Sequence, residues 1–321
     1  MINQKVLFNT WNAAFFIVGG GEIQLLNSRK YLEQKKVNIQ LYDMWKPQLD
    51  IDIFHQFSSV PGVENVVDAY RAAGKKIVMS PIFWNENLTE KYPLHFHYRS
   101  LFNKVDILLT NSELESQLIS RLFNIPPEKC HKTRNSISNE YLDQKTTFNF
   151  KKEYNIEGDF ILTVANIDER KNTQRLVKAC EELGIKLVSI GATRHLEQLN
   201  AVKESPNFLS LGTLSDTNIL KSAYQACSLF ILPSMCETPG IAALEAASQG
   251  SKIVITECGS AKEYFQDHVT YVNPWSTESI VEGIKTERNL TRDDTLSKFV
   301  CQNYTWDKTA IDIIEGYKKI L

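Results

Sequence analysis

Residues 229–250 read L-F-I-L-P-S-M-C-E-T-P-G-I-A-A-L-E-A-A-S-Q-G. The first four residues are apolar and predict a buried strand, and the loop that follows carries Glu237. Pro239 and Gly240 open a helix of small residues that bears Glu245 and stops at the last glycine. A proline near the first turn and a glycine just past the last turn are the usual signals for a helix start and end. The stretch therefore predicts a strand–loop–helix unit.

The end of this helix that lies nearest the strand favours binding of an anion. The first N–H groups of a helix have no partner within it and carry the positive end of its dipole, so they suit a group such as a diphosphate. Glu237 lies in the loop ahead of the helix, and Glu245 lies about one turn into it. Two carboxylates at different depths beside a phosphate site suit a ligand with hydroxyls on both sides of its phosphates. A nucleotide-sugar is such a ligand.

The order of strand, P-S, Glu237, P-G-I, L-E-A and closing glycine resembles glycosyltransferase family 4, retaining enzymes of the group 1 type. Similar motifs run from about Phe160 to Asn273 and include D-E-R-K-N-T, S-I-G-A, L-G-T-L-S-D and C-G-S-A-K-E. The likeness is thinner in the first half, where G-G-G-E, D-I-F-H and T-N-S-E match. The resemblance implies the GT-B architecture, an α/β fold of two Rossmann-like, doubly wound parallel-sheet domains facing a cleft. The alternative is a Rossmann-type unit with two ordinary surface glutamates.

A second motif, V-A-N-I-D-E-R-K-N, covers Val164–Asn172 at the end of another predicted strand. Family members usually read V-G-R-L-x-x-x-K-G there, with both basic residues clamping the donor diphosphate. Lys171 matches the lysine, and its charge would stabilise the departing phosphate. Asn166 stands in place of the arginine, and Arg170 is the residue expected to supply the missing cation. A solvated loop lysine remains the alternative for Lys171.

A third motif, V-G-G-G-E, lies between the first predicted strand and the first long helix. It fails the G-x-G-x-x-G fingerprint of dinucleotide-binding folds, and no acidic residue stands convincingly at the ribose position, so a nicotinamide dehydrogenase is disfavoured. In the family an equivalent glycine loop faces the donor phosphates, which points to Gly20 and Gly21. A plain turn at the helix entry is the equally good alternative.

The resemblance also gives roles to individual residues of the donor site. It implies that Glu245 binds the ribose hydroxyls and that Glu237 binds the donor sugar, with Glu237 and Lys171 as the catalytic residues. Transfer is expected at the front face of the sugar, without an enzyme nucleophile and without a metal ion. The predicted donor-binding residues are Gly20, Gly21, Asn166, Arg170, Lys171, Gly191, Thr238, Gly240, Ile241 and Glu245.

Strand and helix patterns alternate twice along the chain, which predicts one parallel sheet in each half. We expect an acceptor-side domain at 1–150, a donor domain at 151–303, and an amphipathic helix at 304–321 that packs back on the first domain. The polar segment 136–158 contains the predicted boundary. The expected strands are 5–9, 38–42, 51–56, 76–80, 105–110, 160–165, 186–190, 208–211, 229–232 and 253–256.

Composition limits the classes of partner. The 321 residues carry a net charge of −2 with a pI of about 6.3, which gives no electrostatic reason to bind nucleic acid. No apolar run approaches the ~20 residues that a transmembrane helix needs, and no signal peptide is evident. The six cysteines fit neither a metal site nor a disulfide framework. We therefore expect a cytoplasmic protein, with peripheral contact at the inner face of the membrane as a further expectation.

Other candidate residues have weaker support. Asp50-Ile51-Asp52 matches the D-x-D metal motif of a different glycosyltransferase architecture, but is expected to cap a strand. His55, His95 and His97 are candidate general bases. An aromatic and basic stretch, 84–102, would line an acceptor site, touch a membrane or simply pack in the core.

Together these features predict a retaining glycosyltransferase that moves a sugar from a UDP- or GDP-linked donor to a hydroxyl of a glycan or lipid-linked acceptor. No cofactor is expected apart from this nucleoside-diphosphate sugar. Two alternatives stay open. One is a catalytically silent partner subunit of the same fold, suggested by Asn166 and by the absence of the histidine that many family members carry near the end of the fourth strand. The other is a nucleotide-sugar epimerase of similar architecture.

Overall fold

The computed structural model describes residues 4–291 and 293–321 and divides them into two compact units. The first unit runs up to Asn135 and resumes with Trp306–Leu321, and the second comprises Ser136–Thr305. The chain therefore passes from one unit to the other between Asn135 and Ser136, which differs from the boundary predicted after residue 150.

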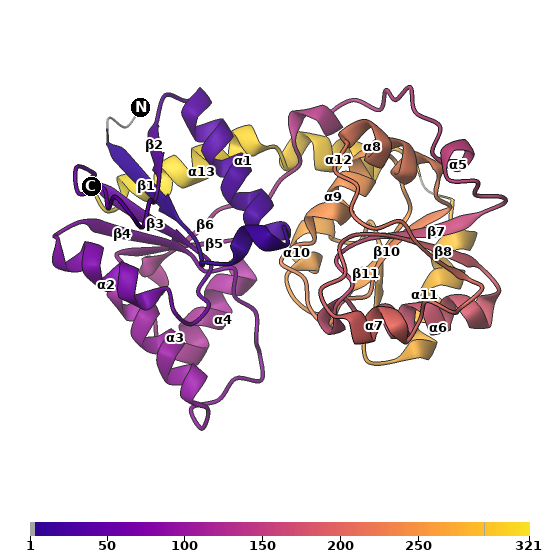
Figure 1. The fold of residues 1–321 in the computed structure, drawn as a ribbon, viewed down its shortest axis with the longest axis horizontal. Helices are drawn as coiled ribbons and strands as arrows, with labels where there is room; N and C mark the ends of the chain where they lie inside the picture. The colour runs from indigo at the N-terminus through magenta and orange to yellow at the C-terminus, as the bar shows by residue number, and fades with distance from the viewer. Residues whose placement is uncertain (1–3, 292) are drawn as a thin grey trace. The chain divides into compact units, whose positions relative to one another are not determined.

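The first unit is built on a six-stranded parallel sheet of order β2-β1-β3-β4-β5-β6 (Figure 1). Its central strands are buried on both faces, as expected for a sheet with helices on each side, and β3 also buries the polar residues His55 and Gln56. Strand order reverses between β1 and β3, since β2 lies on one side of β1 and β3 on the other. The strands are β1 Lys5–Asn9, β2 Asn38–Leu41, β3 Ile53–Phe57, β4 Lys76–Ser80, β5 Ile107–Thr110 and β6 Cys130–Lys132.

Helices cover both faces of this sheet. Figure 1 shows α1 and α13 on one face and α2, α3 and α4 on the other. The last helix, α13, packs along α1 and against β5, and it buries Trp306 and Tyr317. The helices are α1 Gly20–Gln34, α2 Glu64–Ala72, α3 Pro93–Lys104, α4 Glu113–Phe123 and α13 Trp306–Lys318.

The second unit also has a six-stranded parallel sheet, of order β12-β11-β10-β7-β8-β9. Here the order reverses between β7 and β10, and one buried cluster fills each face. The strands are β7 Phe160–Val164, β8 Lys186–Ile190, β9 Phe208–Ser210, β10 Leu229–Leu232, β11 Ile253–Thr256 and β12 Thr270–Val272. The helices are α5 Phe150–Glu153, α6 Thr173–Leu183, α7 Leu196–Asn200, α8 Thr217–Ala226, α9 Ile241–Ser248, α10 Ala261–Phe265, α11 Thr277–Asn289 and α12 Thr295–Asn303.

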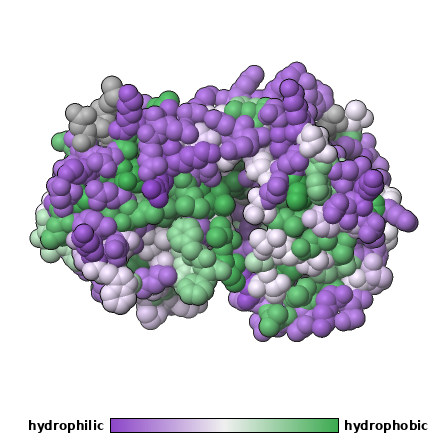
Figure 2. Space-filling model, turned by 45° about the horizontal axis from the view of Figure 1, so that its top comes forward, coloured by the Kyte–Doolittle hydropathy of each residue, from purple (hydrophilic) through white to green (hydrophobic). Residues whose placement is uncertain are grey.

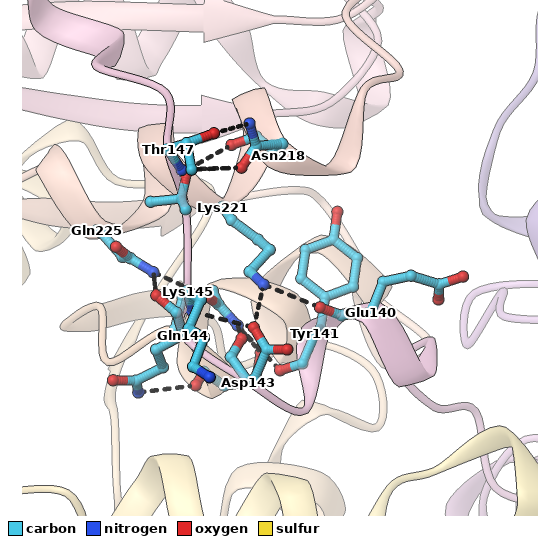
Figure 3. A network of polar contacts seen from close by, with 12 residues as sticks. Glu140, Tyr141, Asp143, Gln144, Lys145, Thr147, Asn218, Lys221 and Gln225 are labelled. Carbon is cyan, nitrogen blue, oxygen red and sulfur yellow. Dashed lines mark hydrogen bonds and ion pairs between the residues drawn. The ribbon is translucent and has the colours of Figure 1, made fainter.

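The segment 136–150 belongs to the second unit, where side chains of α8 and the residue that follows α9, Gln249, hold its backbone (Figure 3). Lys221, only 5% exposed, donates to the Glu140 carbonyl at 3.1 Å and to an Asp143 carboxylate oxygen at 2.6 Å. Gln225 donates to the Gln144 carbonyl at 2.7 Å. These bonds replace the sheet and helix bonds that a polar connection lacks.

The predicted strands agree with the structure to within two residues at each end, and the doubly wound parallel sheet of each half is confirmed. Two edge strands, β6 and β12, were not predicted. Each has three residues and only β12 has one that is fully buried, so neither shows the apolar run of a central strand.

The aromatic residues of α3 and of the loop before it differ in solvent exposure. Phe102 is fully buried in the core, whereas Tyr92 is 58% and Phe96 is 75% exposed. Figure 2 shows hydrophobic patches among a largely hydrophilic surface on the face drawn there. Among the residues the structure describes, no helix has both the length and the apolar character to cross a membrane.

Candidate functional site

The loops at the carboxyl ends of β7 and β10 bring Lys171 and Glu237 together. In an open parallel sheet the crevice at the reversal of strand order is the usual place for a ligand, and β7 and β10 flank that point. The Lys171 ammonium lies 2.5 Å from Glu237 Oε1, and the two side chains are 15% and 6% exposed. Two residues 66 positions apart in the chain thus form a largely buried ion pair.

Local capping bonds place Lys171. It ends a short 3-10 helix, Glu169–Lys171, whose first N–H groups are capped by Asp168, with the Lys171 N–H donating to Asp168 Oδ1 at 2.8 Å. Asn172 follows with a φ of 62°, a left-handed conformation that asparagine adopts more readily than most residues. Its side-chain amide donates to the Pro233 carbonyl at 3.0 Å and to the Pro274 carbonyl at 2.7 Å.

Asn172 was not predicted to have a role. By binding the loops after β10 and β12 it fixes the end of the Lys171 loop relative to both. The sequence feature that could have indicated this role is the asparagine itself. It stands between a basic pair and a predicted helix start, where a residue with left-handed backbone conformation is common.

Charges around Glu237 determine its ionisation. Burial raises the pKa of this carboxyl, but the Lys171 and Arg170 charges and the Lys171 hydrogen bond outweigh burial, so the pKa lies below its usual value. Glu237 is therefore a carboxylate at neutral pH. Arg170 is exposed, and its carbonyl accepts from the Met235 N–H at 2.8 Å, which ties the two loops together.

Gly259 fixes the backbone of Glu237. The two residues form a parallel bridge, and a Cβ built on Gly259 would lie 2.1 Å from the Glu237 carbonyl oxygen. Only glycine permits this approach, and Gly259 also has a φ of 100°. The Glu237 side chain is thus directed by backbone contacts on its own loop and on the loop after β11.

The start of α9 presents donors beside this pair. Gly240 is the residue before the helix and has a φ of 88°, so glycine is favoured there. Within the described part of the chain, the N–H groups of Thr238, Gly240 and Ile241 donate no hydrogen bond. Pro239 has no N–H. The three predicted backbone donors are therefore available to a ligand, with the positive end of the helix dipole behind them.

Glu245 lies on α9, five residues into the helix, and is half-buried. Tyr224 of α8 donates its hydroxyl to Glu245 Oε2 at 3.0 Å. Burial raises the pKa of Glu245 to about 7, against the lowering effect of hydrogen bonds from Tyr224 and Tyr141. Neither tyrosine was singled out from the sequence.

Asn166 and Gly191 lie together where the loops after β7 and β8 cross. The Asn166 side-chain oxygen accepts from the Ala192 N–H at 3.2 Å. A Cβ on Gly191 would lie 2.0 Å from the Ala165 carbonyl oxygen, so this position requires glycine for the crossing itself. The loop crossing thus explains why glycine is needed at position 191, independently of the predicted role of Gly191 in donor binding.

Gly20 and Gly21 lie in the first unit, in the first turn of α1. The Glu22 carboxylate accepts from the Gly19 N–H at 2.8 Å and caps the helix start. A Cβ on Gly20 would meet nothing within 4 Å, and one on Gly21 would meet Ile82 Cδ1 at 3.3 Å. This geometry suits a turn at the helix entry, and a role in donor binding stays a prediction.

The weaker candidates have structural partners. Asp52 accepts from the Lys5 N–H at 2.8 Å and Asp50 pairs with the Lys5 ammonium, both at the amino end of the strands of the first unit. His55 is fully buried, with Tyr317 Oη at 2.7 Å and Ser80 Oγ at 3.0 Å, and burial lowers its pKa to about 3.

The other two histidines bind backbone carbonyls. His95 pairs with the Leu122 carbonyl at 2.8 Å, and His97 with the Ser59 carbonyl at 3.3 Å. In residues 4–291 and 293–321, no group of three His, Cys, Asp or Glu side chains is arranged to hold a metal ion, and all six cysteines are free thiols.

Comparison with known proteins shows which family and fold this chain resembles. Residues 144–291 match the family model described as glycosyl transferases group 1. The chain is 26% identical to an uncharacterised glycosyltransferase of Methanocaldococcus jannaschii over 69% of its own length and 62% of that protein. It is 30% identical to the N-acetylgalactosamine-N,N'-diacetylbacillosaminyl-diphospho-undecaprenol 4-alpha-N-acetylgalactosaminyltransferase of Campylobacter jejuni, over 62% of this chain and 54% of the relative. The chain thus spans between half and two thirds of these two relatives.

The same fold occurs among solved structures. The Anabaena protein HepE in complex with UDP-glucose superposes with a TM-score of 0.78, at 14% identity, over 99% of this chain and 100% of that chain. The resemblance to group 1 glycosyltransferases is therefore confirmed, as is the GT-B fold class with its two Rossmann-like domains. The narrower assignment to family 4 stays a prediction.

Proposed function

We propose that this chain, whose residues 144–291 match the glycosyl transferases group 1 model, transfers a sugar from a nucleoside-diphosphate sugar to an acceptor hydroxyl with retention of configuration. The observation that carries the proposal is the Lys171–Glu237 ion pair beside the open N-terminus of α9. A buried cation, a buried carboxylate and unpaired N–H groups meet at one edge of the sheet. These are the groups that a sugar with a diphosphate leaving group requires.

Each residue then has a chemical role. The N–H groups of Thr238, Gly240 and Ile241 bind the phosphates, and the Lys171 ammonium neutralises charge that grows on the leaving diphosphate. Glu237 accepts hydrogen bonds from the donor sugar while it holds Lys171 in place. Arg170 adds a second positive charge from the solvent side. No residue is assigned as a nucleophile, and the leaving phosphate takes the proton of the acceptor hydroxyl.

The donor is proposed to be UDP- or GDP-linked, and the acceptor a glycan or a lipid-linked saccharide bound by the first unit. Support for this class comes from the Campylobacter jejuni relative, whose name describes transfer to a diphospho-undecaprenol saccharide. Support for the nucleotide comes from the Anabaena structure, which holds UDP-glucose. The proposed setting is the cytoplasm, with peripheral contact at the membrane and without a metal ion.

A thermal-shift panel of UDP-, GDP- and ADP-sugars tests the donor site. A ligand at 100 times its Kd stabilises the folded state by about 2.7 kcal/mol, and for a unit of this size that raises Tm by roughly 5–10 °C. The response should disappear in Glu237→Gln and persist in Glu282→Gln, which removes an exposed carboxylate on α11. An unshifted Tm with every donor would overturn the proposal.

Turnover separates the alternative functions. Two results support retaining transfer. The nucleoside diphosphate is released, and NMR shows that the anomeric bond of the transferred sugar has the same configuration, axial or equatorial, in the product as in the donor. Binding without release in the presence of acceptor extracts would instead indicate a silent partner, for which the uncharged Asn166 is the specific reason. Conversion of the donor sugar without an acceptor would indicate an epimerase.

A further inference from the structure

We propose that Tyr224 and Tyr141 are positioning residues of the donor site, which hold the Glu245 carboxylate in place and leave part of its acceptor capacity for the ribose of a nucleoside diphosphate. This inference rests on the proposed function, because that function assigns the ribose to Glu245. It adds two residues that neither the sequence motifs nor the family match single out.

The two hydroxyls reach the carboxylate from different elements. Tyr224 lies on α8, is fully buried, and donates to Glu245 Oε2 at 3.0 Å. Tyr141 ends the 3-10 helix Asn139–Tyr141, is 4% exposed, and its hydroxyl lowers the pKa of the Glu245 carboxyl. The tyrosine ring centroids are 6.3 Å apart with an interplanar angle of 55°. The carboxylate is therefore held by the Tyr224 hydroxyl, with the Tyr141 ring beside that of Tyr224.

Counting acceptors shows what remains for a ligand. An ionised carboxylate offers about four lone-pair sites. Two are used by the tyrosine hydroxyls, so about two are left, which equals the number of hydroxyls on a ribose. Glu245 is half-buried whereas both tyrosines are buried, and we infer that the remaining sites are those that the ribose uses.

The position of Tyr141 is fixed by hydrogen bonds to the backbone of the segment 136–150, in which it lies. The Tyr141 carbonyl accepts from the Gln249 side-chain amide at 2.9 Å, and the preceding Glu140 carbonyl accepts from Lys221 at 3.1 Å. Figure 3 shows Tyr141 within this network, next to Glu140 and Asp143. The contacts that hold the connecting segment therefore also hold a hydroxyl at the site.

The tyrosines also affect the charge of Glu245. Burial raises its pKa to about 7 although both hydroxyls lower it, so loss of either hydroxyl raises the pKa further. In the described chain Tyr224 and Tyr141 are the titratable groups that act on this carboxyl. Lys221, one turn before Tyr224 on α8, has its ammonium on Asp143. A protonated carboxyl has fewer acceptor sites, and its affinity for ribose should fall.

The first test needs no ligand. Glutamate carboxyls are labelled with 13C, and the resonance that is missing in Glu245→Gln identifies Glu245. Its titration midpoint should move to higher pH in Tyr224→Phe and Tyr141→Phe. The midpoint should stay in place in Tyr271→Phe, whose hydroxyl instead donates to the Gln266 carbonyl. An unchanged midpoint in both site variants would overturn the inference.

The second test measures affinity for UDP, GDP and ADP by calorimetry between pH 5.5 and 8.5. Each Tyr→Phe variant should bind the preferred nucleotide about 3- to 10-fold more weakly at pH 7, as expected for one lost hydrogen bond. The loss should shrink at pH 8.5, where the carboxyl is ionised again. A purely structural role would weaken binding equally at every pH, and this result would contradict the inference.

The two tests distinguish the inference from the function beneath it. If the wild type binds no nucleoside diphosphate while the Glu245 midpoint moves in both variants, the proposed function fails and the tyrosines hold a carboxylate without that ligand. If the wild type binds and both variants bind with the same affinity and pH profile, the function stands and the positioning role is wrong.

Discussion

Lys171 and Glu237 are the residues on which the site depends most. Each is largely buried, and the Lys171 charge is the largest of the effects that lower the pKa of Glu237 against its burial. Removing one partner from such a pair leaves an uncompensated buried charge, which is more harmful than loss of a surface pair. The pair therefore has a structural effect as well as its proposed catalytic one.

Lys171→Ala should reduce kcat by at least ~100-fold, because the cation meets charge that grows in the transition state. The pKa of Glu237 should rise in this variant, since burial then acts without Lys171 to oppose it. Steady-state kinetics and the pH dependence of donor binding measure the two effects. Weaker donor binding with unchanged turnover would make Lys171 a binding residue only.

Arg170→Ala tests whether this exposed residue supplies the second cation. We expect kcat to fall in Arg170→Ala, as it does in Lys171→Ala. Adding Asn166→Arg to the Arg170→Ala variant should restore part of the lost activity. An exposed charge that is screened by solvent is worth under ~1 kcal/mol, so full activity in Arg170→Ala would make it an ordinary surface residue.

Gly191→Ala should destabilise the second unit by about 4 kcal/mol or more, because its Cβ would overlap the Ala165 carbonyl. Gly212→Ala is the matched control, with a φ of 67° and nothing within 4 Å of the added Cβ. That variant should cost only about 1–2 kcal/mol for the left-handed backbone. Urea unfolding compares them, and equal costs would refute the steric argument.

At the level of elements, a buried lysine is one of the side chains that hold the connecting segment 136–150 on the second unit. Lys221→Met should remove its bonds to Glu140 and Asp143 and cost about 1–3 kcal/mol. Lys285→Met on α11, which breaks an exposed pair with Glu282, should cost under ~1 kcal/mol. Hydrogen exchange at residues 140–146 should accelerate only in Lys221→Met.

Strands that are built around an apolar run could be predicted from the sequence. Strands β1, β4, β8, β10 and β11 have the predicted bounds, whereas β3 and β5, although buried throughout, each begin two residues later than predicted. The proximity of Lys171 and Glu237 also followed, since loops at the carboxyl ends of parallel strands share one edge.

Other parts of the site depend on contacts that leave no local pattern. Tyr141 lies in a segment with no apolar periodicity, and its approach to Glu245 depends on Lys221 and Gln249. The crossing that requires Gly191 is likewise set by the spacing of two loops in space. These contacts depend on side-chain lengths and on the tertiary fold, which spacing in the sequence does not encode.

At the scale of the whole molecule, one buried group in each unit should give the units opposite responses to pH. The pKa of His55 is about 3 when folded and near 6.5 when unfolded, so its contribution to stability is present above pH 6.5 and lost as pH falls toward 3. The pKa of Glu245 is about 7 when folded and near 4.5 when unfolded, so its contribution is present below pH 4.5 and lost as pH rises toward 7.

Between pH 6.5 and 5, His55 should reduce the stability of the first unit by about 2 kcal/mol. Hydrogen exchange of each unit at pH 5 and 7.5 measures the response. The His55→Gln variant should lack this decrease, and Glu245→Gln should lack the opposite trend in the second unit. Identical pH profiles in wild type and His55→Gln would show that His55 has no such effect.

The passage of the chain between the units bears on how the protein folds during its synthesis. The first unit contains α13, which supplies the Tyr317 hydroxyl to His55 and places Gly316 against Leu109 and His131. Domains generally fold as they leave the ribosome, the N-terminal one first. Here the second unit is complete once Thr305 has emerged, whereas the first still lacks a helix. The order of folding should therefore run against the order of translation, because the face of the first unit that α13 covers stays open until α13 has been made.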